Sequence, residues 1–439
     1  MVEGMITTGL LDQHTGRRLA SGDQASLADL MRLHKVPAVS AAVLVDGSEP
    51  RSEAHGTATV RTVFQACSIS KHVAAFGTLR LAEQGVLDLD EDVDAYLTSW
   101  RLPESDGWRP VVTTRQLLSH TAGLSYNWFR GFHPDDPLPT LRQVLDGEPP
   151  ANTPPVRPTM LPGSRFRYSG SHYAVLQQLL EDVTGTPFAD LMRALVLDPL
   201  GLADSSYDQT FPHQRPAADG HHVDGTPVSG KWRVQPELAG AGLWTTPTDL
   251  VRLGAEVLRA STGRSALLTE QTAADMLTPQ VPGGYGLGVH TTPGRFGHTG
   301  GNIGYSCWLF TWPDTATTAA VMINNASGDE VLFGLLDEAE RRFTRVAAAG
   351  TPTGVYLVRD DYAIEITETD GRLHLHTPNQ VPVPLRPLAP GRYRAAGLDC
   401  EIRVTGPDTV EVRQESDTTT ATRKFPARGT APRTDSTRS

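Results

Sequence analysis

Cysteine and lysine are both scarce in this chain of 439 residues. The three cysteines, Cys67, Cys307 and Cys400, show neither metal-ligand spacing nor the even pattern of a disulfide framework. Only four of the 39 basic residues are lysines, and the others are arginines. We therefore expect no metal site, no cofactor and no disulfide-stapled scaffold. A lysine that stands beside a potential nucleophile is an informative signal in such a chain.

Long apolar segments are absent as well. No run of about 18 apolar residues occurs, so we expect no transmembrane helix and no membrane partner. Residues 1–22 lack the apolar core and cleavage pattern of a secretory signal, which predicts a cytoplasmic protein. The net charge of −11 argues against nucleic acid as a partner, because nucleic-acid binding needs a basic face. The length is sufficient for a sizeable core and more than one domain.

The most informative stretch that is present is Ser68-Ile69-Ser70-Lys71, at the start of an expected amphipathic helix that ends near Gly85. Ser68 and Lys71 are three residues apart, so they share one helical face, one turn apart. A serine hydroxyl needs a neighbouring base, and a lysine amine can serve once its pKa is lowered. The start of a helix also offers free N–H groups to an oxyanion. The alternative is a chance pair, because serine is common.

Two segments further along could contribute to a site. Residues 113–123 predict a capped helix, in which His120 would fix the helix end by hydrogen bonds rather than act as a base. Residues 127–162 are proline-rich and predict a long loop. This loop is either a pocket wall or a solvated connection, and it carries four candidate wall residues, Trp128, Phe129, Phe132 and His133.

Tyr168 precedes an expected helix at 173–184, a junction where a side chain can enter a cleft or pack in the core. The small residues at 239–242 suit either a close backbone approach near a site or a plain connection. A loop without defensible metal-ligand spacing carries three histidines, His213, His221 and His222.

His298-Thr299-Gly300-Gly301 is expected at the end of a strand. Glycine there lets the backbone approach a substrate closely. An N–H group on this strand edge would complete an oxyanion hole with the N–H of Ser68. A simple glycine turn between two strands would give the same pattern.

The rest of the chain predicts an α+β protein with an antiparallel sheet. A separate β-domain is expected over residues 351–425, because apolar and polar residues alternate there between turns. The tail at 428–439 is polar and predicted to be disordered. Strands of the sheet are expected at 37–45, 58–64, 285–289, 295–298, 305–310 and 319–324, and a closing helix at 332–345.

The ordered set Ser68-x-x-Lys71, Tyr168-Ser169-Gly170 and His298-Thr299-Gly300 resembles the motifs of the serine β-lactamase and penicillin-binding-protein superfamily. Connecting phrases place the resemblance in its class C β-lactamase, esterase and transacylase branch. The resemblance implies a β-lactamase/transpeptidase-like catalytic domain over 1–347, with a helical insert at about 81–240. The C-terminal domain is similar to a lipocalin-like β-barrel.

The resemblance also implies roles for individual residues. Ser68 would be the acylated nucleophile, Lys71 its base and Tyr168 a proton shuttle. The N–H groups of Ser68 and Gly301 would form the oxyanion hole. His298 stands where much of the family has lysine, and Gly170 where it has asparagine, so penicillin turnover is in doubt. Substrate contacts are expected from Gly170, Thr299, Gly300, Trp128 and Phe129.

Three functions remain open at this point. We favour an acyl-serine enzyme that transfers the acyl group of a small-molecule donor to an amine or alcohol, or cyclises it, in natural-product biosynthesis. A plain ester or amide hydrolase is the second interpretation, because water exclusion decides which nucleophile attacks the acyl-enzyme. A non-catalytic binding or sensor protein that kept the fold is the third. The oligomeric state is not predicted.

Overall fold

A computed structural model describes residues 26–425 except 213, 281–284, 293, 327, 344–351, 360–361, 370–371, 378–381, 390, 397–399, 407 and 415–416. The chain divides into two compact units, residues 1–343 and 344–439. Each unit is described below by itself. The predicted tail at 428–439 and His213 lie outside the described residues.

The first unit is built on a six-stranded sheet in the order β2-β1-β8-β7-β6-β5, and every pair in it is antiparallel. This confirms the predicted antiparallel sheet. Its central strands are almost fully buried because helices cover both faces of the sheet. The strands are β1 (Ala38–Val45), β2 (Arg51–Gly56), β5 (His290–Thr292), β6 (Arg295–Asn302), β7 (Tyr305–Trp312) and β8 (Thr317–Ile323).

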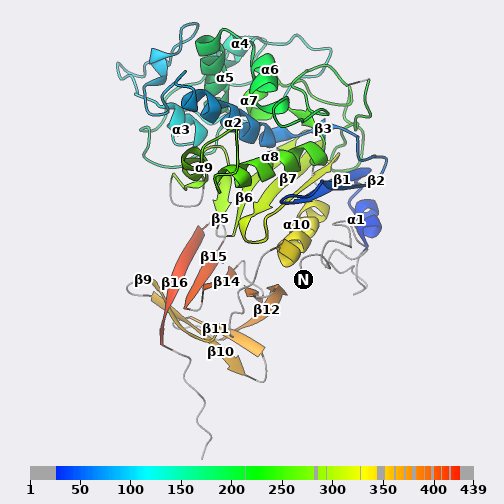
Figure 1. Ribbon diagram of the computed structural model, residues 1–439, viewed down its shortest axis with the longest axis vertical. Helices are drawn as coiled ribbons and strands as arrows, with labels where there is room; N and C mark the ends of the chain where they lie inside the picture. Colours follow the sequence, from blue (N-terminus) through cyan, green and yellow to red (C-terminus); the bar gives the residue numbers. More distant parts are fainter. Residues whose placement is uncertain are drawn as a thin grey trace, which may run out of the picture. The chain divides into compact units, whose positions relative to one another are not determined.

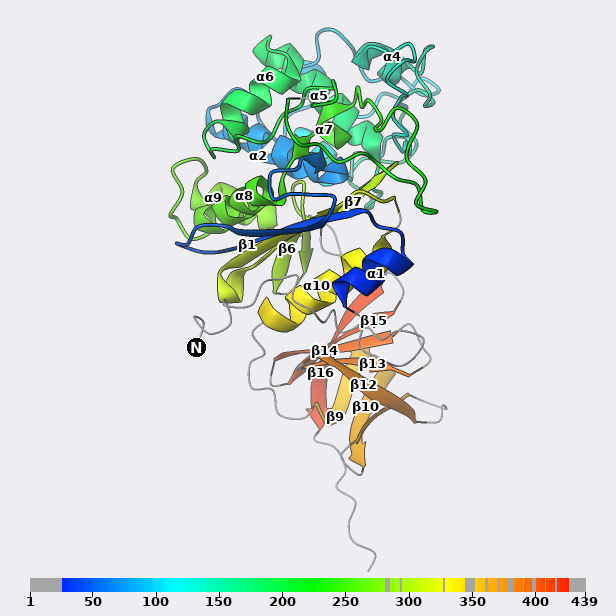
Figure 2. The same ribbon diagram turned by 90° about the vertical axis from the view of Figure 1, so that its right-hand side faces the viewer.

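The two faces of the sheet carry different helices. α8 (Pro247–Ala260) packs on one face, against β1, β7 and β8, while α10 (Asp329–Phe343) and α1 (Leu27–Leu33) cover the other, as Figures 1 and 2 show. Thr246 caps the start of α8, because its side chain accepts a hydrogen bond from the backbone N–H of Asp249. The result is a three-layer arrangement of helix, sheet and helix.

A mostly helical region lies beyond the α8 face of the sheet (Figure 1). Its centre is α2 (Ser70–Glu83), which we expected to be amphipathic. In fact it is buried on all sides along Ser70–Leu79, because it packs against other helical segments, among them α6 (Phe188–Met192) and α7 (Leu238–Ala241). The other helices that accompany it are α3 (Thr114–Leu118), α4 (Leu141–Asp146), α5 (Gly170–Thr184) and α9 (Glu270–Leu277).

A separate two-stranded sheet leads into α2. β3 (Phe64–Gln65) pairs with β4 (Trp244–Thr245), and the N–H of Ala66 donates to the carbonyl of Leu243 at 2.8 Å. The entrance to α2 is thereby joined to the segment that follows α7. Sequence reasoning extended this strand back to residue 58, but residues 58–62 have no ladder partner, and the N–H of Thr62 closes a turn on the Thr59 carbonyl.

Other expected boundaries also moved. Residues 285–289 do not form a strand, because only Tyr285 makes an isolated bridge, and the chain enters β5 at His290. The helix expected over 113–123 ends at Leu118, where the chain turns through residues 119–123. α5 begins earlier than expected, at Gly170, because Ser169 caps it.

The second unit is a closed antiparallel barrel in the order β10-β11-β12-β13-β14-β15-β16-β9. Alternating residues such as Ile364, Ile366 and Ile402 point into its apolar core. The barrel confirms the small β-barrel expected at the C-terminal end. Its strands are β9 (Gly354–Arg359), β10 (Tyr362–Thr369), β11 (Arg372–His376), β12 (Val383–Ala389), β13 (Arg392–Ala395), β14 (Cys400–Gly406), β15 (Thr409–Gln414) and β16 (Asp417–Phe425).

Candidate active site

Ser68 lies in a tight turn between β3 and α2. The turn is a 3₁₀ element, η2 (Cys67–Ile69), and Cys67 has a left-handed backbone with φ of 51°. This conformation is uncommon for a residue with a side chain and marks a sharp change of direction. Ser70 holds the turn, since its Oγ donates to the Cys67 carbonyl and accepts from the N–H of Leu243. Ser68 remains accessible while both of its neighbours are buried.

The Lys71 amine reaches Ser68 from the first turn of α2. Nζ lies 3.1 Å from Ser68 Oγ and donates a 2.7 Å hydrogen bond to the Gly240 carbonyl. The side chain is almost completely buried, and no carboxylate of the described residues forms an ion pair with it. Burial lowers the pKa of this amine to about 7. A neutral lysine able to take a proton is thus available near neutral pH.

Tyr168 completes a group of three around the nucleophile. Ser169 fixes the backbone beside it, because its Oγ caps α5 and also donates to the Ser125 carbonyl. The Tyr168 ring centre lies 5.1 Å from Lys71 Nζ. Burial raises the pKa of the Tyr168 phenol, and a hydrogen bond with Ser68 partly opposes that rise. The phenol therefore stays protonated at neutral pH and can donate its proton.

His120 is buried against Tyr168, in the turn that follows α3. Its ring packs against the Tyr168 ring at a centroid distance of 4.2 Å. Its Nδ1 lies 3.0 Å from His172 Nδ1 and accepts a 3.3 Å hydrogen bond from the N–H of Ser169. Burial lowers the pKa of His120 far below its usual value, so the ring is neutral. It supports the position of Tyr168 from behind.

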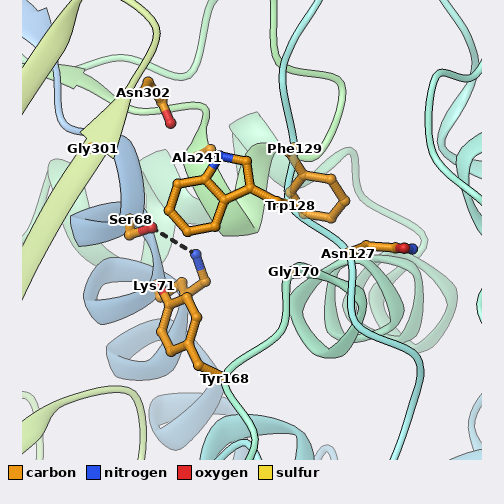
Figure 3. Close-up of a pocket in the computed structure, with 10 residues that line it drawn as sticks. All are labelled: Ser68, Lys71, Asn127, Trp128, Phe129, Tyr168, Gly170, Ala241, Gly301 and Asn302. Carbon is orange, nitrogen blue, oxygen red and sulfur yellow. Dashed lines mark hydrogen bonds between the residues drawn. The ribbon is translucent and has the colours of Figure 1, made fainter. Parts of the chain in front are cut away.

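One open pocket brings several of the candidate residues together (Figure 3). Trp128 and Phe129 both line it, so the start of the 127–162 loop forms a wall of the pocket. Trp128 is 54% exposed, and Phe129 only 8%. Figure 3 shows both aromatic side chains among the residues that surround the pocket. The residues that line the pocket are Ser68, Lys71, Asn127, Trp128, Phe129, Tyr168, Gly170, Ala241, Gly301 and Asn302.

Sequence reasoning missed Asn127 and Asn302, and it placed Ala241 in a run of small residues that suits either a site or a plain connection. Ala241 follows the carbonyl that binds Lys71, and the run of small residues around it was the available signal. Asn302 is one residue beyond the glycine pair on β6, and its buried Nδ2 atom has no hydrogen-bond partner among the described residues. It can donate to a substrate. The Asn127 side chain points away from Ser68 in Figure 3 and donates to the Pro154 carbonyl.

Only some of the motif residues on β6 line the pocket. Gly301 lines the pocket, and no other atom approaches the position of a side chain there. Gly300 has no such freedom, because a Cβ would lie 2.6 Å from the Ala66 carbonyl. Its glycine lets β6 pass close to the turn that carries Ser68. His298 and Thr299 do not line the pocket, and His298 is buried with its Nε2 3.1 Å from the Tyr285 hydroxyl.

Two other expected features lie away from the pocket. Phe132 is buried and pairs with Val234, while His133 contacts Ser229. His221 contacts Asn324. Within the described part of the chain, no group of three histidine, cysteine or acidic residues is arranged to hold a metal ion. None of the helices described there is both long and apolar enough to span a membrane.

The fold and the Ser68–Lys71–Tyr168 group indicate the serine β-lactamase and penicillin-binding-protein superfamily, and comparison with known families agrees. The family model described as Beta-lactamase matches residues 24–339, so the chain belongs to the β-lactamase family. The expected superfamily is thereby confirmed.

Individual proteins of known structure or sequence are similar to this chain. Esterase EstB of Burkholderia gladioli is 31% identical over 216 residues, which span 44% of this chain and 51% of that esterase. The crystal structure of SurE matches 91% of this chain and 97% of its own, with 25% identity and a TM-score of 0.55. EstCE1, described as a hydrolase with promiscuous acyltransferase activity, matches 73% and 97%, with 23% identity and a TM-score of 0.58. Hydrolase and esterase chemistry therefore occurs on this fold.

Proposed function

We propose that this protein is a serine acyltransferase that forms an ester between Ser68 and the acyl group of a small ester or amide. The observation that carries the proposal is the 3.1 Å contact between Ser68 Oγ and a buried amine whose pKa is about 7. A lysine at that distance that has no carboxylate partner can act as the base that serine needs. Neither a metal nor a cofactor is required for this step.

Acylation proceeds by addition and elimination. The neutral Lys71 amine takes the Ser68 proton while Oγ attacks the substrate carbonyl carbon. The carbonyl oxygen becomes an oxyanion, and the proposed donors to it are the N–H groups of Ser68 and Gly301. The bond to the leaving group then breaks, and that group receives a proton from the Lys71 ammonium through Tyr168. The acyl group remains on Ser68.

The second half-reaction distinguishes transfer from hydrolysis. An amine or alcohol acceptor attacks the acyl-enzyme and loses its proton to Lys71 through Tyr168. The Lys71 ammonium then returns a proton to Ser68 Oγ as the acyl–oxygen bond breaks. Support for transfer comes from the pocket walls, since Trp128 and Phe129 present apolar surface to the pocket that Ser68 lines, and such surface offers no hydrogen bond to a bound water. An internal amine of the acyl group would give a cyclic product, as in natural-product biosynthesis.

Hydrolysis is the second candidate, because Trp128 is more than half exposed and Ser68 can be reached from solvent. Intact-protein mass spectrometry separates the two candidates. The protein is incubated with an activated acyl ester, the adduct on Ser68 is identified, and its decay is followed with and without added amines. Transfer predicts that some amines discharge the adduct at least about tenfold faster than water does.

Two variants control this experiment. Ser68→Ala should form no adduct and resist labelling by a fluorophosphonate, whereas Ser164→Ala, which removes an exposed serine, should behave as wild type. An adduct that persists in Ser68→Ala would remove Ser68 as the nucleophile. Decay at one rate, whatever amine is added, would select the hydrolase.

A further inference from the structure

The ring of Phe129 fills the space beside Gly170 that a side chain would otherwise occupy. A Cβ at position 170 would lie 2.5 Å from Phe129 Cε2 and 2.7 Å from Cζ. Both distances are shorter than any ordinary carbon–carbon contact. The same ring faces Gly240, where a Cβ would lie 3.2 Å from Cε2. Two glycines from different segments thus make room for one aromatic ring.

The position of Phe129 is fixed by the backbone around it. The N–H of Gly170 donates to the Asn127 carbonyl at 2.9 Å, and the N–H of Asn127 donates to Ser169 Oγ at 3.1 Å. These bonds tie the loop that carries the ring to the segment that carries Tyr168. Phe129 is 8% exposed, so the ring is held between the two segments and shows only a small surface to the pocket.

The ring lies next to two parts of the catalytic group. Gly170 is two residues from Tyr168, and the Gly240 carbonyl accepts the hydrogen bond from Lys71. The Phe129 ring therefore gives the pocket an apolar wall at this point. A polar group of a substrate placed against this wall would lose its hydration without gaining a hydrogen bond, which is unfavourable.

We infer that Phe129 determines acyl specificity. Its ring occupies the space of a side chain at position 170 and gives the pocket an apolar wall. This wall selects acyl groups that carry no polar amide beside it. The substrate class is a neutral aliphatic or aromatic ester or amide. This inference rests on the proposed function for its substrate, and on the two glycine contacts for its geometry.

The test of specificity compares two acyl groups of similar size. p-Nitrophenyl hexanoate presents a methylene chain, whereas p-nitrophenyl N-acetylglycinate presents an amide at the same distance from the carbonyl. Each rate is first divided by the rate at which hydroxide cleaves the same ester, because the acylamino group activates its carbonyl. On this scale hexanoate should acylate Ser68 at least about tenfold faster in the wild type, the scale set by one unsatisfied polar group. Phe129→Ala should bring the two rates within about threefold, because water and the amide can then enter the space beside Gly170.

Phe132→Ala is the matched control, since Phe132 is a buried phenylalanine of the same loop that does not line the pocket. It should keep the wild-type ratio of the two rates. Equal rates in the wild type, or the same change of ratio in both phenylalanine variants, would overturn the inference.

A thermal unfolding cycle tests the geometry without any substrate. Gly170→Ala should lower the unfolding midpoint of the wild type by roughly 5 °C, because the methyl group meets the ring. When Gly170→Ala is added to Phe129→Ala, the decrease of the unfolding midpoint should be clearly smaller. When it is added to Phe132→Ala, the decrease should be as large as in the wild type. Some loss should remain, because the methyl would also lie 2.9 Å from the Asn127 carbonyl. Equal losses in all three backgrounds would refute the shared space.

The two readouts separate the two proposals. If no ester acylates Ser68 in any variant, the proposed function and the acyl selectivity are both wrong. The unfolding cycle then still shows whether the Phe129 ring and a side chain at position 170 compete for the same space. If esters acylate Ser68 but the rate ratio does not depend on Phe129, only the inference about specificity falls.

Discussion

Lys71 Nζ binds the Gly240 carbonyl more closely than it binds Ser68 Oγ, at 2.7 Å against 3.1 Å. The carbonyl therefore orients the amine, and the serine receives an amine that is already in place. A lone carbonyl offers less to an ammonium ion than a carboxylate would, so burial dominates and lowers the pKa of Lys71. The protonation state of Lys71 should therefore change near neutral pH.

The rate of acylation should rise with pH through about 7 and level off above it, because the neutral amine is the active form. The groups that face Lys71 are Cys67, Tyr168, Tyr173, His120 and His298. Both histidines stay neutral in this range, so a single ionisation is expected. Single-turnover acylation measured from pH 5.5 to pH 9 checks it, and a flat profile would remove Lys71 as the base.

Tyr168→Phe should slow the chemical step by at least about 10²-fold with little change in KM, because only the hydroxyl that passes the proton is lost. Tyr126→Phe is the matched control, an exposed tyrosine of the neighbouring loop, and it should keep the wild-type rate. Single-turnover kinetics with the same ester measures both. If Tyr168→Phe also keeps its rate, Tyr168 has no role in proton transfer.

His120→Ala should lower the free energy of unfolding by about 2–4 kcal/mol. Alanine disfavours the left-handed backbone of this position, where φ is 59°. The N–H of Ser169 and the ring of His172 would also each lose a partner. Urea unfolding measures the loss. A variant that keeps full stability but loses activity would instead indicate that His120 acts in the chemistry.

Acid should destabilise the first unit strongly, because it buries several neutral histidines. Burial lowers the pKa of His72 and His172 to about 3 and that of His290 to about 4, below the usual 6.5. The unfolded chain then binds more protons than the folded one, so stability is lost as pH falls below about 6.5. Each such histidine costs roughly 2 kcal/mol at pH 5.

Urea unfolding from pH 7.5 to pH 4.5 measures this slope. His72→Asn removes one titrating ring whose two nitrogens have no partner among the described residues. The variant should show a shallower dependence on pH than the wild type. A stability that is constant over this range would contradict the prediction.

Much of the architecture follows from local sequence signals. The Ser68–Lys71 spacing predicted a shared helical face, and the alternating pattern after residue 351 predicted strands, because both depend on contacts between near neighbours. The wrong predictions depend on distant contacts. α2 is not amphipathic because the elements that bury its outer side lie more than a hundred residues away in sequence, among them α7. Residues 285–289 alternate like a strand but find no ladder partner there.

The site was partly predictable for the same reason. Tyr168 and Gly301 carried motif signals, and the structure brings both to the pocket beside Ser68. No signal linked Phe129 to Gly170 and Gly240, because a ring packed between two glycines is visible only when three separate segments are folded together. His298 carried a motif signal but is buried behind the pocket, in contact with Tyr285.

The turn that carries Ser68 is anchored directly on the six-stranded sheet. Cys67 Sγ donates to the Tyr305 carbonyl of β7, and Cys307 Sγ of the same strand donates to the Ala66 carbonyl. A methyl group at position 300 would meet this turn, since it would lie 2.6 Å from the Ala66 carbonyl. A substitution that displaces β6 would therefore move Ser68 together with the sheet, and the nucleophile and its proposed oxyanion donors would be disturbed as one unit.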